Sequence, residues 1–193
     1  IHTRKSLAKL DHLVVQDIFM TETAWFADVV LPASAHAEKL GTYTNTNRQV
    51  QIGRNVVDPP KGVKQDWWII QEIAKRIGLD WNYNSPKEIF NEMKLIMPSL
   101  NNISWERLEK ENYVTYPVRS KNVPGEDIIF YNGFPTSNNL AKIVPVDLIN
   151  PNDEINSDFP LILSTGRLLE HWHTGTMTRK AIILNDLEPD PIV

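Results

Sequence analysis

Short apolar runs alternate with polar stretches over the first fifty residues. The runs "HLVVQD" (12–17) and "DVVLP" (28–32) predict two short buried strands, and "TETAWFA" (21–27) predicts a helix between them with Thr21 placed to cap it. Strand, helix and strand in this order indicate a parallel βαβ unit. The segment "GTYTNTNRQVQI" (41–52) alternates in side-chain character and predicts an extended or hairpin structure that begins at a glycine turn.

Helical periodicity replaces this alternation further along the chain. Between Asp66 and Gly78, apolar residues at i, i+3, i+4 and i+7 predict an amphipathic helix; they are Ile70, Ile73, Ala74 and Ile77. A second helix is predicted in "SPKEIFNEMKLIMP", with the N-cap, first helical residue, capping-box partner and terminating proline at Ser85, Pro86, Glu88 and Pro98. The stretch "ISWERLEK" (103–110) predicts one more short helix.

A change in residue composition divides the chain into two parts. Residues 112–139 are rich in Pro, Gly, Asn and Ser, so we place a domain boundary there and predict domains over 1–125 and 126–193. Beyond the boundary, "LAKIVPVDL" (140–148) and "FPLILS" (159–164) have strand character. The pattern therefore predicts an α/β first domain and a second domain that opens with strands.

The composition excludes several classes of function for this segment. The chain has 193 residues and a formal net charge of −4, from 20 Lys and Arg against 24 Asp and Glu, and no basic run indicates a nucleic-acid partner. It has no cysteine, which excludes disulfides, thiolate zinc sites, cysteine-ligated iron–sulfur clusters and a thiol nucleophile from this segment. No apolar stretch reaches the roughly 20 residues needed to cross a bilayer. The chain opens on Ile1 and stops in "LEPDPIV" as a new β-branched segment begins, so we expect a piece of a longer polypeptide.

The densest polar cluster is "TGRLLEHWHTGTMTR" (165–179), directly after a predicted strand. Arg167 is a bidentate donor for phosphate, Arg179 is a second cation, and the ring groups and threonine hydroxyls add donors and a stacking face, so the cluster favours a phosphorylated heterocycle. Two alternatives stay open. The His-x-His spacing of His171 and His173 suits a metal, although a third ligand is not evident, and the cluster could also be an ordinary polar loop.

A second cluster follows the first predicted strand. Asp17 and Thr21 lie at its carboxyl end, where open α/β sheets usually bind nucleotides, and a carboxylate there could accept hydrogen bonds from guanine. Both residues could instead cap the helix, and Asp66 has the same two interpretations. A third polar set consists of Glu38, Gly41, Thr42, Asn45 and Arg48, in which the arginine could meet a phosphate or a buried carboxylate.

Taken together and in order, three stretches resemble the molybdopterin-dependent formate dehydrogenase alpha subunit of the dimethyl-sulfoxide-reductase superfamily. They are "LVVQDIFMTETAWFADVVLPASAHAEKLGTYTNTNRQVQ", "QDWWIIQEIAKRIG" and "FPLILSTGRLLEHWHTGTMTR". The resemblance covers nearly the whole chain. It implies the end of a parallel-sheet α/β molybdopterin oxidoreductase domain, followed by the start of a β-barrel-like molybdopterin dinucleotide-binding domain.

The resemblance also implies chemistry and partners. The full enzyme would oxidise formate to CO2 at a bis(molybdopterin guanine dinucleotide) centre with Mo or W, and electrons would leave through a 4Fe–4S cluster to iron–sulfur, flavin or hydrogenase subunits. The metal ligand, the catalytic residues and the cluster cysteines would lie upstream, so this segment would bind cofactor without catalysing the reaction. A prokaryotic cytoplasmic location is expected. Nitrate reductase, a non-catalytic NADH dehydrogenase subunit on the same scaffold and a free-standing nucleotide-binding module are the alternatives.

Site residues carry over position by position. Asp17 and Thr21 resemble contacts to one guanosine, Asp66 a base-reading carboxylate, and Glu38 and Gly41 the adjacent pocket wall. The contacts to pyrophosphate and pterin would come from Arg167, Leu168, His171, Trp172, His173 and Thr174, in a loop shaped by Thr165, Gly166, Thr176 and Thr178. The family often has Glu where this chain has Asn47, so no carboxylate role is expected there.

Overall fold

The chain forms two units by its internal contacts. The computed structural model describes residues 2–151 and 154–190, and its contacts group into Ile1–Leu140 and Ala141–Val193. Within the described residues, no helix is long and apolar enough to cross a membrane.

A parallel strand pair opens the first unit. Strand β1 (Val14–Asp17) pairs in parallel with β2 (Val29–Pro32), and a bridge between Ala33 and Lys64 extends the parallel arrangement by one more segment. The predicted parallel unit is therefore confirmed. The predicted helix over 21–27 is wrong in extent: a single 3-10 turn, η1 (Ala24–Phe26), is found. The backbone becomes extended at Ala27, because the chain must enter β2 two residues later.

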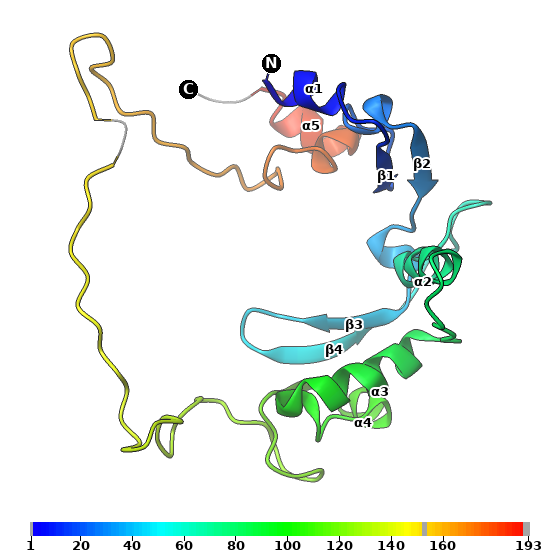
Figure 1. Ribbon diagram of the computed structural model, residues 1–193, viewed down its shortest axis with the longest axis vertical. Coiled ribbons are helices and arrows are strands. Elements are labelled where there is room, and N and C mark those ends of the chain that lie inside the picture. The colour runs from blue at the N-terminus through cyan, green and yellow to red at the C-terminus, as the bar shows by residue number, and fades with distance from the viewer. Residues whose placement is uncertain (1, 152–153, 191–193) are drawn as a thin grey trace. The chain divides into compact units, whose positions relative to one another are not determined.

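The predicted hairpin is confirmed and gains a third strand. Strand β3 (Gly41–Thr44) pairs antiparallel with β4 (Gln49–Gly53), and the two arrows run side by side in Figure 1. Strand β5 (Tyr113–Thr115) adds to the free edge of β4, with Val50 opposite Val114. The sequence did not predict β5, which joins the sheet across about sixty residues of intervening chain.

Three α-helices lie between β4 and β5 along the chain, and two of them pack on the hairpin. Helix α2 (Asp66–Arg76) and helix α3 (Pro86–Ile96) agree with the periodicity, α4 (Trp105–Glu111) agrees with the third predicted helix, and α1 (His2–Leu7) was not predicted. Short 3-10 turns η2 (His36–Glu38) and η3 (Pro98–Leu100) lie between them. The predicted stop at Pro98 is confirmed.

Two details of the helix predictions are wrong. In α2 the apolar stripe of Ile70, Ile73 and Ile77 is largely exposed, whereas Ile69, Gln71 and Ala74 are buried. The reason is that the described first unit packs on the neighbouring stripe of the helix. In α3, Ser85 occupies the N-cap position without a side-chain hydrogen bond, and the Glu88 carboxylate instead accepts from the backbone N–H of Asn84 at 2.9 Å.

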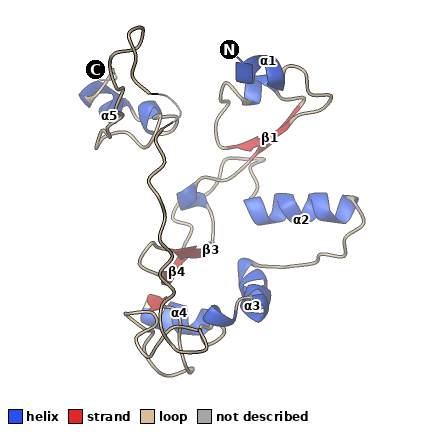
Figure 2. Cartoon of the chain, turned by 60° about the vertical axis from the view of Figure 1, so that its left-hand side comes forward, coloured by secondary structure: helices blue, strands red, loops and turns tan. Residues whose placement is uncertain are grey.

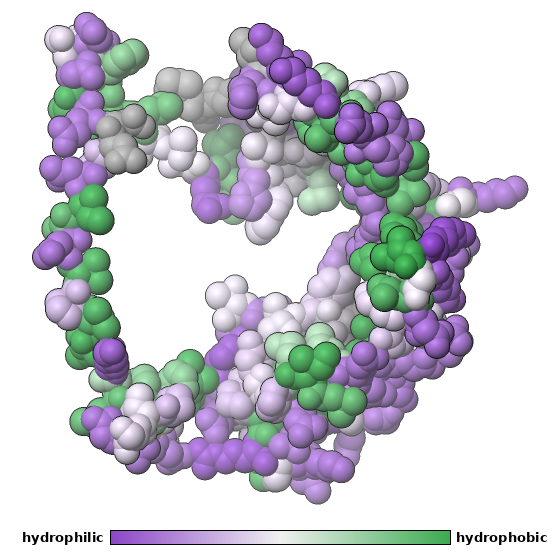
Figure 3. Space-filling view, viewed as in Figure 1, coloured by the Kyte–Doolittle hydropathy of each residue, from purple (hydrophilic) through white to green (hydrophobic). Residues whose placement is uncertain are grey.

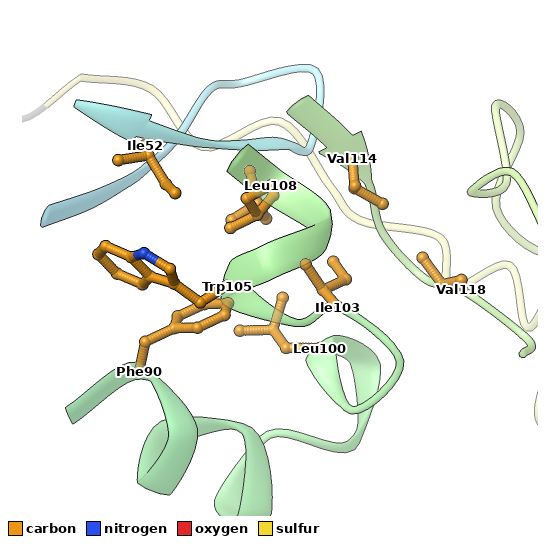
Figure 4. Packing of buried hydrophobic residues seen from close by; sticks show 9 residues of the cluster. Ile52, Phe90, Leu100, Ile103, Trp105, Leu108, Val114 and Val118 are labelled. Atoms are coloured by element: carbon orange, nitrogen blue, oxygen red, sulfur yellow. The ribbon is translucent and has the colours of Figure 1, made fainter. Parts of the chain in front are cut away.

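The core lies between α3, α4 and the three-stranded sheet. Its buried residues are Val50, Ile52, Phe90, Leu100, Ile103, Trp105, Leu108, Val114 and Val118. Figure 4 shows these side chains converging from the two helices and the strands, with the Phe90 and Trp105 rings meeting edge to face at 6.3 Å. Each fully buried side chain of this size contributes about 1.5–3 kcal/mol, so this cluster is the main source of stability in the unit.

The second unit has little regular structure. Between β5 and the 3-10 turn η4 (Thr178–Lys180) no helix or strand is found among the described residues, and Figure 2 draws this stretch as loop. Helix α5 (Ile182–Leu187) follows η4. The predicted strands over 140–148 and 159–164 are not formed, because neither segment has a neighbouring strand for its backbone hydrogen bonds. Their apolar side chains lie on the surface, and green and purple residues alternate along the 140–148 segment in Figure 3.

Candidate functional site

Asp17 and Thr21 lie where the sequence placed them, at the carboxyl end of β1. Asp17 Oδ1 accepts from the backbone N–H groups of Ile18 at 2.7 Å and Phe19 at 3.3 Å, and Thr21 Oγ1 accepts from the N–H of Ala24 at 3.3 Å. Both side chains therefore fix the local turn, as the capping interpretation expects. The carboxylate of Asp17 has further lone pairs that could accept hydrogen bonds from a ligand, and this contact stays a prediction.

The carboxylate of Asp66 connects β1 to the segment just before β3. It is the first residue of α2, and Gln65 rather than Asp66 holds the N-cap position. Asp66 Oδ1 accepts from Gln16 Nε2 at 2.7 Å, and Asp66 Oδ2 accepts from Lys39 Nζ at 2.6 Å. Burial raises the pKa of Asp66, but the hydrogen bonds from Lys39 and Gln16 and the charge of Lys39 outweigh it, so the net pKa lies below the ordinary value. The carboxylate is therefore ionised at neutral pH and held in one orientation.

A cleft of about 250 Å³ adjoins this ion pair. Its polar lining includes Lys39, Thr42, Gln65 and Asp66, and its apolar and aromatic lining consists of Leu40, Tyr43, Trp67, Pro86, Ile89, Phe90 and Met93. Gly41 also lines it, and a Cβ at Gly41 would meet no atom within 4 Å, so the space beside this backbone is open. The cleft thus combines an ion pair with aromatic side chains, and this combination suits a planar heterocycle that has both hydrogen-bond donors and acceptors.

Glu38 lies outside this cleft. Its Oε2 accepts from the backbone N–H of Ala35 at 2.8 Å and closes the turn of η2. Arg48 also serves the fold, because its guanidinium donates to the backbone carbonyls of Tyr116, Glu126 and Asp127. The suggestion that Arg48 meets a phosphate or a carboxylate is therefore not what the structure shows.

The loop of 165–174 in the second unit is largely exposed. Arg167 is exposed and makes no hydrogen bond or ion pair that we find with any described residue. Thr165 and Gly166 are exposed beside it and Leu168 is half-buried. Trp172 is 64% exposed and meets the ring of His173 edge to face at 4.7 Å. The loop thus presents a cation, a ring pair and hydroxyls to solvent.

His171 behaves differently from its neighbours. Its side chain is buried, its Nε2 lies 2.7 Å from the carbonyl oxygen of Glu188, and its Nδ1 lies 3.1 Å from Thr178 Oγ1. A carbonyl only accepts, so Nε2 must carry a proton. Both ring nitrogens are therefore engaged inside the unit. No group of three His, Asp or Glu side chains arranged to hold a metal is found over the ranges that the structure describes.

Two residues that hydrogen-bond to Asp66 were not predicted from the sequence. Gln16 and Lys39 hold Asp66 across 50 and 27 residues of sequence, and no local pattern marks either of them. A weak indication in the sequence is that Gln16 and Lys39 are adjacent to Asp17 and Glu38, which were predicted as site residues.

The chain is similar in sequence to known proteins. Residues 1–76 match the family model described as Molybdopterin oxidoreductase. The whole chain is 43% identical to the F420-dependent formate dehydrogenase subunit alpha of Methanocaldococcus jannaschii and covers 29% of it. Over 97% of its length it is 42% identical to the F420-dependent formate dehydrogenase 2 subunit alpha of Methanococcus maripaludis and covers 28% of that protein.

One solved structure is also similar. Acetylene hydratase from Pelobacter acetylenicus matches 61% of the chain at 29% identity with a TM-score of 0.48, and the match covers 16% of that enzyme. The chain thus spans less than a third of the length of the formate dehydrogenase relatives it matches.

Proposed function

The chain belongs to the molybdopterin oxidoreductase family, and from this premise we propose that it forms the cofactor-binding part of a formate dehydrogenase alpha subunit. The observation that carries the proposal is 43% identity over the whole chain to a relative of that name. Formate oxidation, partners and electron acceptor are proposed for the longer parent protein, because the chain spans 29% of that relative.

The residues of the first unit fit one end of a guanine-bearing cofactor. Asp66 offers a fixed carboxylate, and a guanine ring has adjacent N–H donors that such a group accepts. Lys39 Nζ beside it is a donor suited to the guanine O6. Aromatic walls from Tyr43 and Trp67 line the same cleft and would stack on the ring. We therefore propose that this edge, with Asp17 and Thr21 at the end of β1, binds guanosine.

The exposed loop of the second unit fits the phosphate part. Arg167 can form two parallel hydrogen bonds to phosphate oxygens, and its guanidinium makes no described contact that would have to break first. Thr165 and Thr174 add exposed hydroxyls and Gly166 adds exposed backbone in the same loop, and Trp172 and His173 add a ring surface. We propose that these residues contact the pyrophosphate and pterin, with Leu168 as an apolar neighbour.

When bound, the cofactor supplies the metal, Mo or W, that takes two electrons from formate as CO2 and a proton leave. This chain's residues would hold the cofactor phosphates and base, so that the reacting centre keeps a fixed geometry. A 4Fe–4S cluster and the catalytic side chains are proposed for the rest of the parent protein. Both methanogen relatives are named F420-dependent, so coenzyme F420 is the first electron acceptor to test, with NAD beside it.

Replacing Arg167 tests cofactor binding directly. In the full-length parent, Arg167→Ala should lower the content of metal and pterin per protein, because a hydrogen bond to a charged group contributes about 1.5–3 kcal/mol. Metal analysis and fluorescence of the released, oxidised pterin measure this. Arg54→Ala removes another exposed arginine outside the loop and should leave both contents unchanged. Equal cofactor content in both variants would contradict the proposal.

A substrate test separates formate dehydrogenase from nitrate reductase. The purified parent should reduce a viologen dye or coenzyme F420 with formate and release one CO2 for every two electrons. It should not oxidise reduced viologen with nitrate. Nitrate turnover without formate turnover would keep the family and overturn the proposed activity.

A further inference from the structure

The turn at 171–179 contains two kinds of side chain. Trp172, His173, Thr174 and Thr176 are exposed, whereas His171 is buried and Thr178 and Arg179 are half-buried. The side chains of the second group make the hydrogen bonds that tie the turn to itself and to the residues after α5, whereas Thr174 and Thr176 bond only to each other. This division differs from the expectation that His171 contacts the ligand together with its neighbours.

Thr178 is the centre of the hydrogen-bond network. Its Oγ1 lies 3.1 Å from His171 Nδ1 and accepts from the backbone N–H of Trp172 at 3.1 Å. In the tautomer that carries its proton on Nε2 and donates it to Glu188, Nδ1 is an acceptor to which the Thr178 hydroxyl can donate. One hydroxyl therefore holds both the Nδ1 side of the His171 ring and the backbone N–H of Trp172.

Arg179 fastens the same turn to the residues after α5. Its Nη1 donates to the carbonyls of Pro189 at 2.6 Å and Glu188 at 3.3 Å, and the second of these is also the acceptor for His171. The aliphatic part of Arg179 lies against Gly175, where a Cβ would come within 2.8 Å of it and where φ is +75°. Only glycine satisfies both the close approach and this backbone conformation without strain.

We propose that His171, Thr178 and Arg179 are positioning residues that clasp the 171–179 turn and so present Trp172, His173 and Thr174 to the cofactor. The proposal rests on the proposed function for the identity of the ligand, but the clasp itself is a property of the protein alone. His171 acts through the turn and does not touch the cofactor.

The clasp is tested first in the chain without cofactor. In Thr178→Val the amide exchange of Trp172 should rise roughly 2- to 12-fold, which is the factor that one hydrogen bond contributes. The ¹⁵N resonance of His171 Nδ1 should shift, because this atom loses its hydrogen-bond partner, whereas Nε2 keeps its proton and its bond to the Glu188 carbonyl. Thr178→Ser keeps the hydroxyl and should restore both values, and Thr176→Val, which removes only a hydroxyl bonded to Thr174, should change neither.

A second variant keeps the test decisive if Thr178→Val does not fold. Arg179→Lys retains the charge and loses the contacts to the two carbonyls, so the His171 Nε2 proton should exchange faster. Unchanged exchange and an unchanged Nδ1 resonance in the variants that fold would overturn the clasp.

The positioning role is then tested in the full-length parent. Thr178→Val should lower pterin and metal content, and Thr178→Ser should restore it. Normal content in Thr178→Val with a loosened turn would overturn the positioning role. An Arg167→Ala variant with normal cofactor content, together with a loosened turn in apo Thr178→Val, would reject the proposed function and leave the clasp intact.

Discussion

The apolar core of the first unit and the apolar segments of the second differ in burial although their residues are alike. Leu108 is 0% exposed between α4 and the sheet, whereas Leu163 is 86% exposed in a stretch with four other apolar or proline residues around it. The difference is one of partners. The elements around Leu108 all lie between Gly41 and Val118 and close on each other, whereas residues 159–164 have no neighbouring strand among the described residues. An apolar run predicts the capacity for burial, and the rest of the fold decides whether burial occurs.

The largest expected effect comes from making the same substitution in both regions. Leu108→Ala should lower the free energy of unfolding by about 2–5 kcal/mol, because it removes buried contacts and leaves a cavity. Leu163→Ala should change it by no more than about 0.5 kcal/mol, as is usual for exposed positions. Urea unfolding of the 193-residue chain, followed by tryptophan fluorescence, measures both.

An equal loss from the two leucine variants would break the comparison. It would mean that residues 159–164 are packed in solution, as the strand prediction expects. In the full-length parent the same pair of variants would show whether other parts of the polypeptide cover this segment.

A smaller effect is expected at two glycines, one in each region. A Cβ on Gly53 would lie 2.2 Å from the Tyr43 ring across the hairpin, so Gly53→Ala must displace the ring and should cost about 1–3 kcal/mol. A Cβ on Gly166 would meet no atom within 4 Å, so Gly166→Ala should be nearly neutral in the same urea measurement. A neutral Gly53→Ala would show that the hairpin does not hold Tyr43 in place.

Local patterns predicted much of the first unit. The two parallel strands, the hairpin and the three helices around residues 66–111 follow from periodicity and from punctuation such as Pro86 and Pro98. Features that depend on distant neighbours were not predicted. Strand β5 has only three residues and exists because β4 offers a free edge, and the buried stripe of α2 is set by what packs on it.

The candidate site was predictable to a similar degree. Residues at the carboxyl end of β1 and the start of α2 were singled out because that edge of an α/β sheet is a general binding position. Their hydrogen-bond partners were not, since Gln16 and Lys39 reach Asp66 only after folding. In the second unit, residue type alone grouped His171 with Trp172 and His173, and only the burial and hydrogen bonds of His171 separate it from them.

The smallest expected effect on stability comes from a surface ion pair in the first unit. It shows how much charge, as distinct from apolar burial, contributes to the stability of this unit. Lys87 of α3 and Glu106 of α4 form an ion pair at 2.5 Å. The hydrogen bond from Lys87 and a backbone hydrogen bond lower the pKa of Glu106 to about 2, from an ordinary value of 4.5. A carboxyl whose pKa is lower in the folded state stabilises the fold above its ordinary pKa, so this contribution is present above pH 4.5 and is lost as the pH falls toward 2.

Lys87→Met should therefore raise the pKa of Glu106 toward 4.5 and remove part of the stability difference between pH 5 and pH 2. The pKa should stay somewhat below 4.5, because the backbone hydrogen bond and the contact with Ser104 remain. Side-chain carboxyl NMR titration measures the shift, and Lys110→Met on α4 is the matched control that should leave it unchanged. If the pKa of Glu106 does not move in Lys87→Met, the ion pair is not formed in solution, and the cohesion of α3 and α4 comes from their buried residues alone.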